Sequence, residues 1–142
     1  MADWRNSMDS FFKESNETKK HKDITDFTSF VRDIGLPAFR ELRDQMEKHG
    51  RELTIKETVS SLTARVSYQG KEEVVYGIYG RTFPNGVLPY AEVKYRVRNS
   101  LKITKVESMI RSGTPDYDMS DVTKDEVIES FLGHYMRAVK PA

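Results

Sequence analysis

The chain has 142 residues, 37% of them hydrophobic and 32% charged, and 23 Lys and Arg against 22 Asp and Glu leave a formal net charge of +1. This length predicts one domain, and the near-neutral charge excludes a protein that binds polyanions over its whole surface. It contains no cysteine for thiol chemistry, no apolar run near the roughly 18–20 residues of a membrane helix and no signal-peptide pattern, so we expect a cytoplasmic protein that makes no membrane contact.

An amphipathic helix is predicted at the N-terminus. Residues 1–17 carry a net charge of −2, which suits anionic lipid poorly, so the apolar face is expected to contact its own domain or a second subunit. The charged stretch 16–22 is predicted to be a connector, which makes residues 1–22 a candidate mobile or partner-docking arm. The candidate partner contacts recur at helical spacing and are Trp4, Met8, Phe11 and Phe12.

Two further helices are predicted before residue 50. Apolar side chains follow a helical stripe from Ile24 to Ile34 and again from Phe39 to Met46. The tripeptide Gly35-Leu36-Pro37 is predicted to separate them, because Gly commonly ends a helix and Pro commonly occupies the first turn of the next.

In the middle of the chain the hydrophobic period changes to two, which is typical of half-buried strands. Between the second and third strands, burial favours a three-residue turn at 69–71 that places Val66 opposite Val74, because a two-residue turn would bring Glu73 onto the core face. The pattern predicts a four- to five-stranded antiparallel meander with strands near 53–55, 61–68, 72–78, 91–98 and 101–110.

Two connections in this region are less regular. Two prolines and Asn85-Gly86 predict a loop over residues 82–89. The last strand changes the parity of its apolar side chains between Ile103 and Val106, and a bulge near residues 104–105 would reconcile the two halves.

A final helix follows an acidic loop at residues 112–122. Thr123 and Glu126 have the spacing of a capping box. Helices, a meander and a helix in that order predict a single α+β domain over residues 1–142, with its helices packed on one face of the sheet. The expected buried stripe of the last helix is Val127, Ile128, Phe131, Leu132, Tyr135 and Val139.

The sequence offers no catalytic constellation. Its histidines have no second ligand at helical spacing, and the acidic stretch 116–127 does not match a calcium-binding loop, so we predict no metal site and no cofactor. An enzyme with a pocket between the sheet and the helices is the least favoured interpretation. Its candidate residues are Tyr76 and Tyr95 with His134 or Asp44.

The predicted sheet face opposite the helices is the most specific feature. Residues 81–111 carry a net charge of +5 and residues 112–142 a net charge of −3. The net charge of +1 over the whole chain is therefore an average over a basic pair of strands and an acidic C-terminal segment. Such a face can be merely solvated, can contact a protein or a second copy of the chain, or can bind a phosphate backbone. Its candidate binding residues are Arg65, Tyr79, Lys94, Arg96 and Arg98.

These features favour a small non-catalytic binding or adaptor protein, with a homodimer as its candidate assembly. The alternative is a nucleic-acid-binding module that uses the basic face of the sheet. The sequence identifies neither the ligand nor the biological process, and it leaves open whether the basic face is functional or merely solvated.

Overall fold

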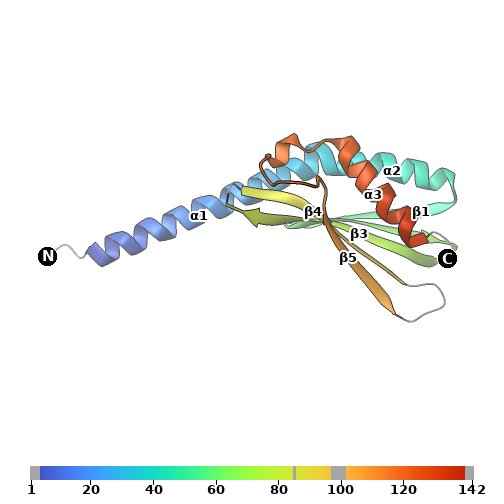
Figure 1. Ribbon diagram of the computed structural model, residues 1–142, viewed down its shortest axis with the longest axis horizontal. Coiled ribbons are helices and arrows are strands. Elements are labelled where there is room, and N and C mark those ends of the chain that lie inside the picture. The colour runs from blue at the N-terminus through green and yellow to red at the C-terminus, as the bar shows by residue number, and fades with distance from the viewer. Residues whose placement is uncertain (1–3, 85, 97–101, 140–142) are drawn as a thin grey trace.

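The computed structural model describes residues 4–84, 86–96 and 102–139, apart from the side chains of residues 11–21. Helices, a five-stranded antiparallel sheet and a C-terminal helix follow one another, which confirms the predicted α+β architecture (Figure 1). None of the helices in these ranges is long and apolar enough to span a bilayer. The elements are α1 (Trp4–Phe30), a π-helical turn η1 (Val31–Gly35), α2 (Leu36–Lys48), β1 (Arg51–Glu57), β2 (Ser61–Tyr68), β3 (Lys71–Phe83), β4 (Gly86–Arg96), β5 (Ile103–Met109), a 3-10 turn η2 (Met119–Asp121) and α3 (Lys124–Val139).

The first half of the chain is more continuously helical than expected. The predicted connector at 16–22 is wrong, because these residues belong to α1. The stretch contains Glu and Lys, which favour helices, and neither Gly nor Pro to end one. Gly35 does not end a helix either, since η1 carries the chain into α2. Instead, a Cβ on Gly35 would lie 2.7 Å from Leu62 Cδ2, so glycine here allows the helix to approach the sheet.

The sheet is a simple meander in the order β1-β2-β3-β4-β5. Val66 lies opposite Val74, as predicted, but Tyr68 pairs with Lys71, so the turn has two residues, both with positive φ. A bulge after Val66 restores the register. It also leaves Glu73 at the rim of the core, where Tyr135 donates a 2.7 Å hydrogen bond to it. The three-residue turn is therefore wrong, while the register of the buried pairs is right.

Two predictions about the second half of the sheet are also wrong. Most of residues 82–89, expected to be a loop, extend β3 and β4, and Pro89 lies within β4 opposite Gly80. Pro89 lies just past the end of the β4–β5 ladder, where its carbonyl oxygen accepts a 3.3 Å hydrogen bond from Ile110 N, and proline is best tolerated at such ladder ends. No bulge interrupts β5, and Val106 lies opposite Val93 on the core face, while Ile103 is exposed.

The helices α2 and α3 cover the same face of the sheet (Figure 1). Tyr76 of β3 is completely buried between them, with edge-on contacts to Phe39 of α2 and Phe131 of α3 at ring-centroid distances of 5.9 and 5.3 Å. Its hydroxyl group makes a 2.7 Å hydrogen bond with Ser130. The predicted stripe of α3 is right at its centre, where Val127 and Phe131 are fully buried, but Leu132 is 37% exposed.

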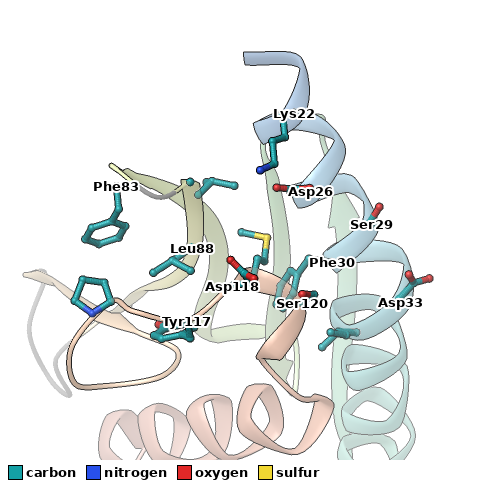
Figure 2. A pocket seen from close by; sticks show the side chains of 15 residues that line it. Lys22, Asp26, Ser29, Phe30, Asp33, Phe83, Leu88, Tyr117, Asp118 and Ser120 are labelled. Carbon is teal, nitrogen blue, oxygen red and sulfur yellow. The ribbon is translucent and has the colours of Figure 1, made fainter. Parts of the chain in front are cut away.

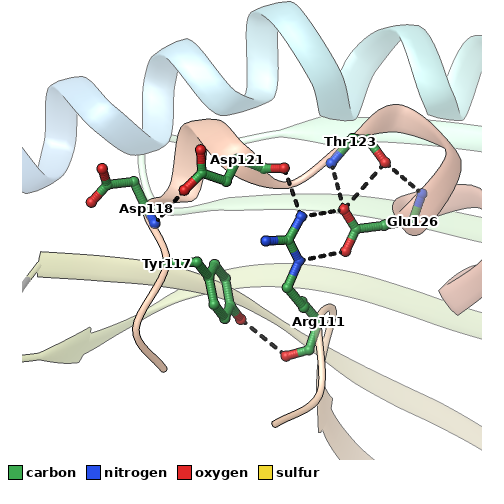
Figure 3. A network of polar contacts seen from close by, with 6 residues as sticks. All are labelled: Arg111, Tyr117, Asp118, Asp121, Thr123 and Glu126. Carbon is green, nitrogen blue, oxygen red and sulfur yellow. Dashed lines mark hydrogen bonds and ion pairs between the residues drawn. The ribbon is translucent and has the colours of Figure 1, made fainter. Parts of the chain in front are cut away.

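The start of α3 is held by a polar network (Figure 3). The capping box is confirmed, since Thr123 N donates to Glu126 Oε1 at 3.1 Å and Glu126 N donates to Thr123 Oγ1 at 3.2 Å. Arg111 donates to both carboxylate oxygens of Glu126 at 2.8 and 2.6 Å, and to the carbonyl oxygen of Asp121 at 2.7 Å. Tyr117 donates to the carbonyl oxygen of Arg111 at 3.0 Å. These bonds fix the acidic loop, residues 112–122, against the helix.

Candidate functional site

The sheet face away from the helices, here called the open face, brings together most of the predicted binding residues. The register places Arg65, Val75, Lys94 and Lys105 in one row across four strands. Arg96 lies on the same face, two residues beyond Lys94. Arg98 lies outside the described residues.

The basic row of the open face has an acidic row beside it. Glu92 and Glu107 are cross-strand partners one row away from Lys94 and Lys105. Lys105 Nζ lies 3.5 Å from Glu92 Oε2 and 3.3 Å from Glu107 Oε1, and Lys94 Nζ lies 3.5 Å from Glu92 Oε1. Arg65 is paired with Glu72 at 3.1 Å. The excess charge read from the sequence is therefore reduced by neighbouring carboxylates.

Tyr79 does not stand alone on this face. Its ring lies over Gly77, where an added Cβ would come within 2.8 Å of the ring, and beside Tyr90 at a centroid distance of 5.6 Å. The guanidinium of Arg81 lies 4.4 Å from the centroid of the Tyr90 ring. This packing covers part of the aromatic surface that a base would need for stacking.

Of the candidate enzyme residues, Tyr76, Tyr95 and His134 lie in or beside the packed core, whereas Asp44 is exposed. Tyr76 is fully buried, and burial raises the pKa of its hydroxyl group far above the ordinary value. His134 is also buried, and its Nε2 atom makes a 2.8 Å hydrogen bond with Ser108 Oγ. Burial, with a smaller effect of the Arg137 charge, lowers the pKa of this imidazole. Neither group lines the hollow described below, which lies elsewhere on the surface.

The N-terminal part of α1 projects away from the rest of the domain (Figure 1). We call residues 4–21 the arm. Two of the four predicted partner contacts can be placed: 64% of Trp4 and 50% of Met8 remain exposed. The expectation that this face packs on its own domain is therefore wrong for these two residues, because the helix carries them beyond the sheet. The side chains of Phe11 and Phe12 lie outside the described part of the structure.

A surface hollow lies at the base of the arm, between α1, the β3–β4 hairpin and the acidic loop (Figure 2). Its volume is about 460 Å³, within the range of about 300–1,000 Å³ that ligand pockets usually have. The apolar part of its lining is Phe30, Ile34, Phe83, Val87, Leu88 and Met119.

Charged side chains surround this apolar lining. Lys22 and Asp26 come from α1, and neither is held in an ion pair within the described residues. Asp33 is paired with Arg32 at 2.9 Å, and the side chain of Asp118 caps η2. Because Arg32 balances the charge of Asp33, Asp26 and Asp118 remain against Lys22 and make the hollow weakly acidic, so it suits an occupant that combines an apolar group with a positive charge.

Sequence reasoning missed the hollow because it treated residues 16–22 as a break in the helix. In one continuous helix, Trp4 and Lys22 are 18 residues apart, and so are Met8 and Asp26. At about 3.6 residues per turn this separation is five turns, which places both pairs on one face of α1. The absence of Gly and Pro from residues 16–22 is the signal that would have joined the arm to the helix that lines the hollow.

Comparison of the chain with known protein families, with curated proteins and with solved structures finds no match in any of the three. Within residues 4–84, 86–96 and 102–139 no three His, Asp or Glu side chains are grouped so that they could hold a metal ion. The function is therefore argued from the arm, the hollow and the open face.

Proposed function

We propose that this protein is a binding protein that self-associates through its arm. The observation that carries the proposal is the exposure of Trp4 and Met8 on a helix that extends beyond its own domain. Trp is among the residue types that supply most of the binding free energy in protein interfaces. The net charge of −2 over residues 1–17 favours a protein partner over an anionic membrane.

The physical chemistry of isolated helices supports the same proposal. In proteins most of the stability of a helix comes from the packing of its apolar face rather than from the intrinsic propensity of its residues. The arm includes many residues of low helix propensity, among them Asn6, Ser7, Asp9 and Ser10. All of residues 4–10 are exposed, so the domain itself contributes no packing to this end of the helix. A partner that covers the apolar face would supply the missing stabilisation.

The test is the molar mass in solution. We expect light scattering over a range of concentrations to show a mass approaching twice the 16.4 kDa of the chain, and deletion of residues 1–20 to return it to the monomer. Trp4→Ala with Met8→Ala should weaken the assembly as the deletion does. Val59→Ser is the matched control, because it removes an equally exposed apolar side chain outside the arm. A strict monomer whose stability ignores the deletion would overturn the proposal.

Nucleic-acid binding by the open face is the second candidate. The row formed by Arg65, Lys94 and Lys105 supports it, and the pairing of these residues with Glu72, Glu92 and Glu107 counts against it. Neutralising several phosphates would make the affinity fall steeply with salt concentration. Undetectable binding to DNA and RNA in both single- and double-stranded form at about 50 mM salt would eliminate this candidate.

A further inference from the structure

The arm tip, defined here as residues 4–8, presents Trp4 and Met8 on the same face of α1 as the lining residues Lys22 and Asp26 of the hollow. Trp4 and Met8 are each five turns from their counterparts at the base, Lys22 and Asp26. Between Trp4 and Asp26 the helix spans about 33 Å at 1.5 Å per residue. If two α1 helices lie antiparallel along this face, Trp4 of each helix lies beside Asp26 of the other.

The chemistry of the tip matches that of the hollow. The tip carries an exposed indole with the guanidinium of Arg5 5.4 Å from the Trp4 ring centroid. The hollow has an apolar wall that includes Phe30 and Leu88, with Asp26 at its edge (Figure 2). An aromatic ring with an adjacent positive charge is the combination that an acidic, partly apolar hollow recognises.

We infer that the hollow receives the arm tip of a second copy of this chain, in a two-fold symmetric dimer whose α1 helices run antiparallel. This inference rests on the proposed function, because it names the receiving site of the arm and the direction in which the two copies pair. The symmetry is closed: each copy gives one tip and offers one hollow, so both hollows are filled and no further copies are added. Trp4 then lies near the partner's Asp26, and Met8 packs along the aliphatic stem of the partner's Lys22.

Engineered cysteines test the direction of the two helices. The chain has no cysteine of its own, so Met8→Cys and Lys22→Cys can be prepared separately, mixed and oxidised without competing thiols. We expect the mixed 8–22 disulfide to predominate. The 8–8 and 22–22 disulfides should form only in the yield at which two copies of Met136→Cys cross-link. Met136 is 61% exposed on α3 and measures random collision. Parallel helices would instead give 8–8 and 22–22 disulfides.

A charge exchange tests the contact between the tip and the hollow. We expect Arg5→Asp and Asp26→Arg each to weaken the dimer about tenfold, because each substitution occurs twice in a symmetric dimer. Combining the two in one chain should restore most of the affinity. Circular dichroism on each variant separates a lost contact from a lost fold.

The outcomes distinguish this inference from the proposed function. A dimer by mass with 8–8 disulfides, or with cross-links only at the control level, overturns the antiparallel arrangement and leaves the role of the arm in assembly standing. A dimer that is indifferent to Asp26→Arg shows that the tip binds elsewhere. A monomer at every concentration removes both proposals.

Discussion

The core beneath α3 buries its large side chains, whereas the arm of α1 leaves Trp4 and Met8 exposed. In the core, Tyr76 is enclosed by rings from two helices and its hydroxyl group is hydrogen-bonded. In the arm, Trp4 and Met8 lie on a helix of low intrinsic propensity with no domain beneath it. The core side chains stabilise the fold, whereas the arm side chains are available for a contact with a second molecule. Substitutions in the two regions should therefore affect different measurements.

The largest effect on stability is expected from Phe131→Ala. Phe131 is fully buried, and its ring contacts both Tyr76 and Tyr135. Removing a buried phenyl ring costs about 3–5 kcal/mol in transfer free energy and residual cavity. Urea denaturation should show this loss, and Met136→Ala on the exposed side of the same helix should change the free energy of unfolding by less than about 0.5 kcal/mol. Similar losses for both variants would mean that α3 does not pack as described.

A smaller effect is expected from Glu126→Gln. Hydrogen bonds from Arg111, with further ones from Thr123, lower the pKa of the Glu126 carboxyl group to about 2, against the opposing effect of partial burial. Because the folded-state pKa is depressed, this stabilisation is present above the unfolded value of about 4.3 and is lost as the pH falls toward about 2. At neutral pH we expect a loss of about 1–2 kcal/mol.

The pH dependence provides the control for Glu126→Gln. The difference in unfolding free energy between wild type and variant should shrink as the pH falls from about 5 to about 2, because protonation removes the same charge from the wild type. A difference that stays constant over this range would show that Glu126 acts only by its shape and not by its charge.

His134 should give the wild type a pH dependence in a separate range. Burial lowers the pKa of its imidazole, so the unfolded chain binds a proton more readily than the folded one. Stability is then highest above the unfolded pKa of about 6.5 and falls below it, by at most about 1.4 kcal/mol per pH unit. Thermal unfolding between pH 7.5 and 5.5 should show this slope. His134→Gln should flatten it, whereas His49→Gln, on an exposed residue, should leave it unchanged.

The smallest effect on stability is expected from Trp4→Ala. An exposed side chain on the arm contributes nothing to the core, so we expect the free energy of unfolding of the domain to change by less than about 0.5 kcal/mol. The same substitution should weaken the assembly that light scattering detects. This combination is the reverse of that expected for a core variant such as Phe131→Ala. A large loss of stability in dilute monomer would place Trp4 in the fold after all.

Much of the fold follows from local patterns. The alternation from Leu62 to Val66 predicts both the strand and the register of its buried pairs, and the Thr123–Glu126 spacing predicts the start of α3. The length of the turn after Tyr68 could not be predicted in this way. With the bulge after Val66, a two-residue turn gives the buried residues the same pairing that a three-residue turn would give without it. The continuity of α1 through residues 16–22 also escapes local reading, since solvated polar residues suit a helix as well as a loop.

Local sequence patterns located only part of the candidate sites. Strand parity placed Arg65, Tyr79 and Lys94 on one face, with Glu92 among them. It did not reveal that Glu107 lies opposite Glu92, because that depends on the pairing of β4 with β5. The hollow combines side chains from three segments far apart in the sequence, so no single motif marks it. Exposure of Trp4 depends on where a continuous helix leaves the domain.

The most direct test of the arm as the assembling element is the fluorescence of Trp4, the only tryptophan in the chain. In the isolated chain this indole is largely exposed. Emission spectra recorded over a dilution series should shift to shorter wavelength as the concentration rises and the indole enters the partner's hollow. With Asp26→Arg the same shift should need a concentration about tenfold higher. Emission that stays at the wavelength of a solvated indole at every concentration would contradict the account.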